Sequence, residues 1–221
     1  NLIGEHTDYN AGLVLPIATH LGCVFTVSRN DDGLLRIASD AFGDDLVTIP
    51  VAELAGAAAR GHWSDYVIGT ARELLDEARG ARGLDLHIAT DLPHGGGLSS
   101  SAAITVGTAT VLDTAWDCGL SRTAIAKTAQ AAENRFVGMQ CGILDPFAIA
   151  MGQAGCALFV ERANPLHLQR GEVGLLEHRH RLAHGLGLVH AAGIAEQRRP
   201  GAALGQPVAG LAPDLDQKGI D

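Results

Sequence analysis

A glycine tract followed by three serines, within Pro93 to Ala103, constrains this chain more than any other segment. The segment lies between a stretch with strand-like alternation of apolar residues and a stretch with a helical apolar pattern. Leu84, Leu86 and Ile88 alternate with polar or small residues, which is typical of a half-buried strand. The apolar residues from Ala102 to Trp116 cover most of a helix circumference, which is typical of a buried helix. The segment therefore predicts a strand, a tight loop and a helix in direct succession.

The loop between strand and helix has the chemistry of a phosphate site. Three glycines let the backbone approach an anion, the serines add hydroxyls and N-cap candidates, and the first helical amides point the same way. The loop is not a Gly-Lys-Ser P-loop, because the only lysines in the chain are Lys127 and Lys218. The alternative is a glycine turn with a serine cap and no ligand, which accounts for only Gly95 and one serine.

The opening residues, Asn1 to Asn10, place two carboxylates and an imidazole close together at Glu5, His6 and Asp8. Carboxylates accept hydrogen bonds from the hydroxyl groups of a sugar, and histidine serves the remaining donors and acceptors. The loop is thus a candidate sugar site. A solvated acidic loop is the alternative.

A third informative stretch lies between Ser121 and Phe147. Residues 121–135 have helical spacing with Ser121 as N-cap, and Glu133 near the end of this helix offers an oxygen ligand to magnesium. Asp145 stands before Pro146, a residue suited to the first turn of a helix. Taken alone, Asp145 is predicted to be an N-cap, with a catalytic base as the alternative.

Together the three stretches resemble the galactokinase family, within the superfamily that also holds homoserine, mevalonate and phosphomevalonate kinases. The opening motif of that family is matched by residues 1–10, its phosphate loop by 93–103, and its helix-end segment by 133–145. The resemblance covers about the first 160 residues. The loop marks the superfamily, whereas residues 4–9 mark the galactokinase branch.

The resemblance implies phosphoryl transfer from ATP to the C1 hydroxyl of galactose, with Mg2+, and it implies roles for matching residues. The family's galactose-binding positions are matched by Glu5, His6 and Asp8, and its catalytic base by Asp145. The loop around the ATP phosphates is matched by Gly95, Gly96, Gly97, Leu98, Ser99, Ser100 and Ser101. The magnesium ligands are matched by a serine, Ser100 or Ser101, and by Glu133.

The sequence also departs from the family pattern. The family's arginine two residues before the first asparagine has no counterpart, because the chain begins at Asn1, so we expect a fragment. The family's third glycine-rich motif and its C-terminal sugar-packing tyrosine have no match either. Pro146 stands where galactokinases have glutamine, which leaves a kinase for a related sugar as one alternative. A non-catalytic regulator that binds sugar and ATP is another.

The sequence changes character after residue 160. We predict an incomplete kinase N-terminal domain over residues 1–160 and an atypical tail over 161–221, either flexible or the product of a shifted reading frame. Half of the ten histidines lie in this tail, and a metal site at His178 and His180 is an alternative.

Composition agrees with a soluble cytoplasmic enzyme, and we expect a monomer whose partners are a sugar and ATP. With 221 residues, 47% hydrophobic content and net charge −9, the chain is long enough to bury a core and has no basic surface for nucleic acid. Its four cysteines form no CxxC pair, so reduced thiols are expected. No stretch is long and apolar enough to span a bilayer.

The remaining elements favour an α+β fold. Strands are predicted at residues 13–16, 23–28, 34–38 and 46–49, with a hairpin turn at Asn30 to Gly33, and a helix at 64–79. Trp63 and Tyr66 are interpreted as packing residues. The order of elements predicts a two-layer domain, with a largely antiparallel sheet and helices on one face.

Overall fold

The computed structural model describes Leu2 and residues 13–93, 97–161 and 167–172. The predictions for Glu5, His6, Asp8, Gly95 and Gly96, and for most of the tail with His178 and His180, lie outside the described residues. In chain order the elements are β1 (Leu13–Val14), β2 (Cys23–Arg29), β3 (Leu34–Ser39), η2 (Asp40–Phe42), β4 (Val47–Pro50), η3 (Val51–Gly56), α1 (Asp65–Glu73), β5 (Leu84–Thr90), α2 (Ser100–Trp116), α3 (Arg122–Ala131), η4 (Ala132–Val137), α4 (Leu144–Met151), β6 (Cys156–Glu161) and β7 (His167–Glu172).

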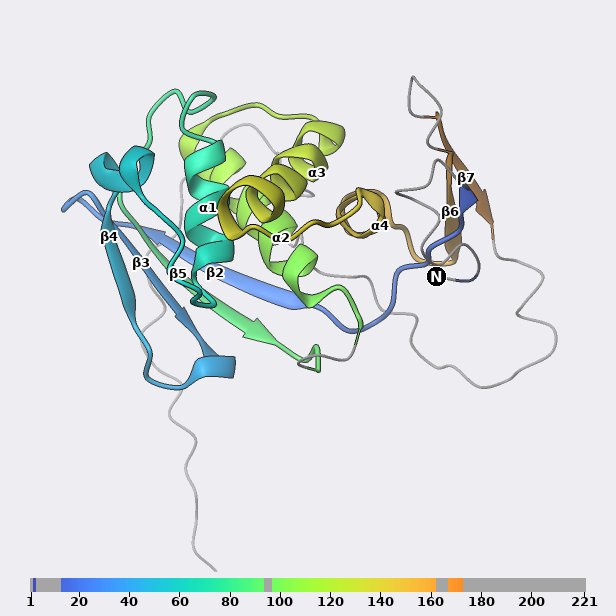
Figure 1. Ribbon diagram of the computed structural model, residues 1–221, viewed down its shortest axis with the longest axis horizontal. Helices are drawn as coiled ribbons and strands as arrows, with labels where there is room; N and C mark the ends of the chain where they lie inside the picture. Colours follow the sequence, from blue (N-terminus) through green and yellow to red (C-terminus); the bar gives the residue numbers. More distant parts are fainter. Residues whose placement is uncertain (1, 3–12, 94–96, 162–166, 173–221) are drawn as a thin grey trace, which may run out of the picture.

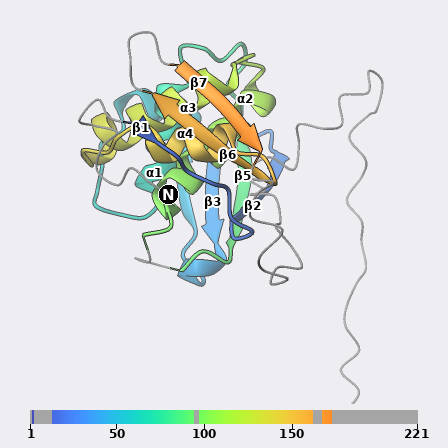
Figure 2. The ribbon, with the colours of Figure 1, turned by 90° about the vertical axis from the view of Figure 1, so that its right-hand side faces the viewer.

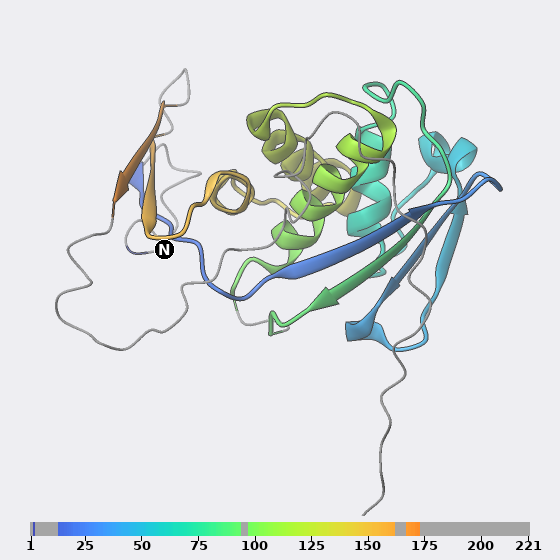
Figure 3. The same ribbon diagram turned by 180° about the vertical axis from the view of Figure 1, so that it is seen from behind.

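The main sheet has four strands in the order β2-β5-β3-β4. Strands β2 and β5 are antiparallel, as are β3 and β4, whereas β3 and β5 are parallel. Helices α1, α2 and α3 lie over one face of this sheet (Figure 1), and the view from behind shows the same two layers (Figure 3). The predicted α+β fold with a largely antiparallel sheet is therefore confirmed.

The predicted hairpin between β2 and β3 is wrong. The two strands are not paired with each other, because β5 lies between them. The turn is bonded to β5 instead: the Asn30 amide N–H donates to the Gly83 carbonyl at 3.1 Å, and Asn30 Nδ2 donates to Asp85 Oδ1 at 2.9 Å. A local turn signal cannot show that a strand from much later in the chain enters between two neighbours.

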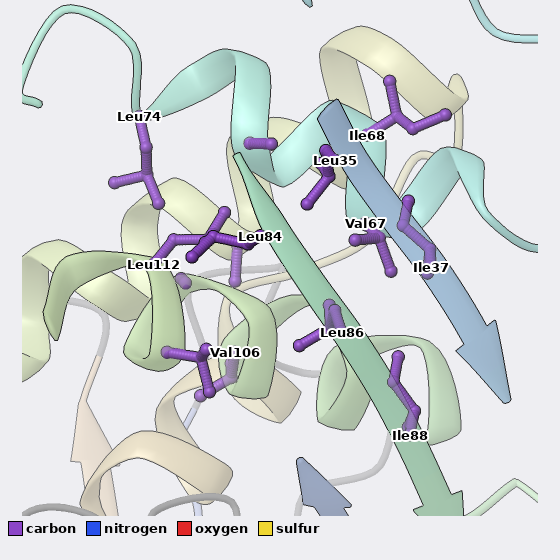
Figure 4. Close-up of a cluster of buried hydrophobic side chains, with 14 of the residues drawn as sticks. Leu35, Ile37, Val67, Ile68, Leu74, Leu84, Leu86, Ile88, Val106 and Leu112 are labelled. Atoms are coloured by element: carbon purple, nitrogen blue, oxygen red, sulfur yellow. The ribbon is translucent and has the colours of Figure 1, made fainter. Parts of the chain in front are cut away.

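The core between sheet and helices follows, in β5, the alternation inferred from the sequence. The inward residues of β3 and β5 are buried against α1 and α2 (Figure 4). Members of this cluster include Leu35, Ile37, Leu84, Leu86, Ile88, Val67, Ile68, Leu74, Val106 and Leu112. Each such side chain contributes about 1.5–3 kcal/mol by leaving water. This packing fixes α2, and with it the loop that precedes α2, relative to the sheet.

Two glycines allow unusually close contacts between elements. A Cβ atom at Gly107 of α2 would lie 2.1 Å from Cε2 of Phe25 on β2. A Cβ atom at Gly69 of α1 would lie 2.8 Å from Cδ1 of Phe136 on η4. Normal carbon contacts are about 3.5–4.0 Å, so each glycine admits a ring that a larger residue would exclude.

A second, antiparallel sheet has the order β1-β6-β7 and lies in front in Figure 2. A small apolar cluster joins β1 and β6 to α4, and it includes Val14, Phe147, Met151, Leu158 and Val160. Strand β7 falls within the range predicted as a tail. The division at residue 160 stays a prediction.

Helix boundaries differ modestly from the predicted ones. Helix α1 ends at Glu73 rather than at residue 79. Ser121 caps α3 as predicted, since its hydroxyl accepts a hydrogen bond from the Ala124 N–H, but the chain continues after Ala131 as the π-helical turn η4. Among the described residues, no helix is both long and apolar enough to cross a membrane.

Candidate active site

The first candidate feature is the start of α2. Gly97 and Ser99 both have left-handed backbones, with φ angles of 66° and 57°. Ser99 is the N-cap residue, but its side chain makes no capping hydrogen bond, so a serine side-chain cap is wrong at this position. Side-chain capping requires an extended N-cap backbone, which Ser99 does not have. A left-handed backbone costs a serine about 1–3 kcal/mol, and residues in such conformations cluster at functional sites.

The second feature is a buried carboxylate against the first turns of α2. Glu133 of η4 is only 3% exposed. Ser101 Oγ donates to Glu133 Oε2 at 3.2 Å, and Thr105 Oγ1 donates to Glu133 Oε1 at 3.1 Å. Ser101 and Glu133, predicted to act together, are therefore brought together. Thr105 was missed, although its spacing of four residues from Ser101 puts both hydroxyls on one helix face.

The π-helical turn η4 places Glu133. The Met139 N–H donates to the Glu133 carbonyl at 2.9 Å, and Gly138 ends the turn with a φ of 84°. The buried residues of η4 are Ala132, Glu133 and Phe136, with Phe136 packed on Gly69 of α1. Single π-helical turns occur frequently at functional sites, because the extra residue turns side chains away from their ordinary helical positions.

The third feature is Asp145, an exposed residue in the first turn of α4. The prediction that Asp145 is an N-cap is wrong, because α4 begins at Leu144 and its N-cap is Ile143. Pro146 does lie in the first turn, where its missing N–H costs no helical hydrogen bond.

Electrostatics connect Asp145 to Glu133. Burial raises the pKa of Glu133, and the nearby charge of Asp145 raises it further, while hydrogen bonds from Thr105 and Ser101 act in the opposite direction. Burial also raises the pKa of Tyr66 on α1, with the Glu133 charge as the next cause. The pair of carboxylates therefore forms an acidic centre that favours a cation.

The donors at this centre are hard oxygens. The described residues contain no group of three or more histidine, cysteine, aspartate or glutamate side chains placed to hold a metal ion. Mg2+ needs fewer protein ligands than that, because it keeps several waters and binds substrate phosphates through one or two carboxylates. A buried carboxylate beside the hydroxyls of Ser101 and Thr105 at a helix start fits such an ion.

Trp63 and Tyr66 behave partly as predicted. The ring of Trp63 stacks on Phe42 with centroids 4.7 Å apart, and Trp63 Nε1 donates to Asp45 Oδ2 at 2.5 Å. Trp63 is thus a packing residue. Tyr66 is close enough to Glu133 to be affected by its charge, which the apolar spacing of α1 did not indicate.

Family models match most of the segments described above. Residues 65–153 match the GHMP kinases N terminal domain, and residues 1–29 match the galactokinase galactose-binding signature. The Streptomyces coelicolor galactokinase is 38% identical over 217 residues, covering 96% of this chain and 55% of that protein. The Exiguobacterium sibiricum galactokinase is 38% identical over 163 residues, covering 73% and 42%. The chain spans about half the length of these relatives.

Solved structures show the same similarity to galactokinases. The Lactococcus lactis galactokinase complexed with galactose has a TM-score of 0.74 and 31% identity, covering 78% of this chain and 45% of that chain. A mevalonate kinase has a TM-score of 0.65 and 19% identity, covering 76% and 52%, which shows a shared fold alone.

Proposed function

Because this chain belongs to the galactokinase family of the GHMP kinases, we propose that its protein transfers the γ-phosphoryl group of ATP to the C1 hydroxyl of galactose. The products are galactose 1-phosphate and ADP. The observation that carries the proposal is the meeting of Glu133 with Ser101 at the start of α2, with Asp145 near enough to affect the Glu133 carboxyl.

Phosphoryl transfer requires alignment and charge neutralisation more than covalent chemistry. In this proposal the backbone amides from Gly95 to Ser101 and the dipole of α2 bind the phosphates of ATP. Glu133 and the hydroxyl of Ser100 or Ser101 would hold Mg2+. When bound, that ion neutralises negative charge on the phosphate oxygens.

Asp145 is proposed as the general base. It accepts the proton of the C1 hydroxyl as that oxygen attacks the γ-phosphorus, so its carboxyl must be ionised when substrate is bound. Its exposed position in the first turn of α4 leaves the carboxyl accessible to a substrate. Glu5, His6 and Asp8 are proposed to bind the sugar hydroxyls, by their match to the galactose-binding signature.

The proposal is tested by a coupled assay of ADP release from the full-length protein with galactose, glucose, arabinose and N-acetylgalactosamine. Galactose should give the highest kcat/KM. A higher kcat/KM for another sugar would point to a related sugar kinase, which Pro146 in place of glutamine makes the relevant alternative. ATP binding without ADP release for any sugar would point to a regulator. We further propose that the protein acts in the cytoplasm and is a monomer.

A further inference from the structure

We propose that Asn134 is a positioning residue, which holds Asp145 at the active centre by clamping the loop of residues 138–143. The inference rests on the proposed function, since it assigns Asn134 a task in the same reaction. Asn134 itself belongs to η4, directly after Glu133.

The clamp is a set of hydrogen bonds to one residue of the loop, Cys141. Asn134 Oδ1 accepts from the Cys141 N–H at 2.9 Å, and Asn134 Nδ2 donates to the Cys141 carbonyl at 3.4 Å. Gln130 of α3 adds a bond from Nε2 to the same carbonyl at 3.3 Å. The Cys141 thiol donates to Asn134 Oδ1 at 3.2 Å. Cys141 is thus held on both sides of its backbone, four residues before Asp145.

The loop is anchored at its two ends: the Met139 N–H donates to the Glu133 carbonyl at 2.9 Å, and Ile143 is buried in the apolar cluster of α4. Between these ends, Cys141 is held by the amides of Asn134 and Gln130. Gly138 adopts a φ of 84° and Gly142 adds a second residue without a side chain. Met139 is 53% exposed and Gln140 is exposed as well, so neither anchors the loop by burial. Ordering a glycine-containing backbone costs more conformational entropy than ordering other residues. The hydrogen bonds from the side-chain amides of Asn134 and Gln130 to Cys141 offset part of that cost.

The position of the clamp explains why it bears on catalysis. Glu133 and Asn134 are consecutive residues of one turn. The Glu133 carboxylate accepts hydrogen bonds from two hydroxyls of α2, and the Asn134 side chain bonds the backbone of Cys141 in the loop. The same turn therefore sets the location of the proposed magnesium ligand and, through Cys141, of the proposed base. Asp145 and Glu133 carry charge of the same sign and repel each other. The loop must therefore be held in place to keep Asp145 near Glu133.

The test is a double-mutant cycle between Asn134→Ala and Asp145→Asn in the full-length protein, with ATP and galactose. Asn134→Ala should lower kcat about 10- to 100-fold, because displacements near 1 Å cost this much. KM for ATP should change less than about threefold, since the phosphate loop is untouched. In the Asp145→Asn background the same substitution should have almost no further effect on kcat. Gln140→Ala, an exposed change in the same loop, is the matched control and should keep wild-type kcat.

Hydrogen exchange supplies a readout that does not depend on activity. The Cys141 amide should exchange faster in Asn134→Ala than in the wild type, whereas amides in α2 should not change. Gln130→Ala, which removes only one bond, serves as a milder variant should Asn134→Ala fail to fold, and should shift kcat and exchange in the same direction by less. Unchanged exchange at Cys141, or a loss of kcat that is equally large in the Asp145→Asn background, would overturn the inference. Absence of galactose turnover in the wild type would instead overturn the proposed function, and the exchange experiment would still test the clamp.

Discussion

Gly107 offers a prediction that the structure makes quantitative. Its missing side chain admits the ring of Phe25, which packs from β2 onto α2. In Gly107→Ala, the new Cβ would lie 2.1 Å from Cε2, 2.4 Å from Cζ and 3.0 Å from Cδ2 of Phe25. The ring must then retreat by roughly 1.4 Å to reach normal contact.

Two opposing terms set the size of the effect. Overpacking of this kind costs about 1–3 kcal/mol. Alanine in a helix interior is about 1 kcal/mol more favourable than glycine. The difference between the two terms is a net loss of about 0–2 kcal/mol in the free energy of unfolding for Gly107→Ala. For a domain of this size, each kcal/mol lost lowers Tm by about 2–4 °C.

The Phe25→Leu background reverses the sign. Leucine lacks the two ring atoms nearest to the new Cβ, so Gly107→Ala should stabilise this variant by about 0.5–1 kcal/mol through helix propensity alone. Thermal and urea unfolding, followed by circular dichroism, measure both effects. Equal destabilisation in the two backgrounds would refute the reasoning, as would stabilisation of the wild type by Gly107→Ala.

Three further predictions concern stability, thiol chemistry and the sugar. Thr108 Oγ1 is buried and has no hydrogen-bond partner among the described residues, so Thr108→Val should stabilise the protein by about 1 kcal/mol in urea unfolding; a lower urea midpoint would contradict this. Burial and neighbouring acids raise the pKa of Cys118 to about 11, so roughly one thiol in 1,000 is ionised at pH 8. Labelling of Cys118 by iodoacetamide should be slow and accelerate about tenfold per pH unit, and a rate independent of pH would exclude this account. Glu5→Ala or Asp8→Ala should raise KM for galactose more than KM for ATP, and equal rises would indicate a general folding defect.

Local patterns predicted much of the fold. Alternation in β5 identified its buried face, and the apolar circumference of α2 identified its burial, because both patterns are direct consequences of packing on one or two sides. The hairpin at Asn30 failed because insertion of β5 is decided by contacts across more than 50 residues. The π-helical turn at η4 was not predicted, because helical spacing does not distinguish an α-helical from a π-helical turn.

The candidate site was predictable in its residue types and only partly in its geometry. Motif matching brought Ser101 and Glu133 together, and the structure places them in hydrogen-bond contact. Thr105 shares a helix face with Ser101, so helical spacing alone could have found it. Asn134 could not be found this way, because its role depends on the path of the loop around Cys141.

The proposed phosphorylation of galactose depends most on Asp145 as the general base. The most direct measurement compares galactose-dependent ADP release by the full-length wild-type protein and by Asp145→Asn, with ATP affinity measured in parallel. We expect the substitution to lower kcat by about a thousandfold while ATP affinity stays within about threefold, because a general base acts on the transition state and not on nucleotide binding. Equal turnover by the two proteins would contradict the account.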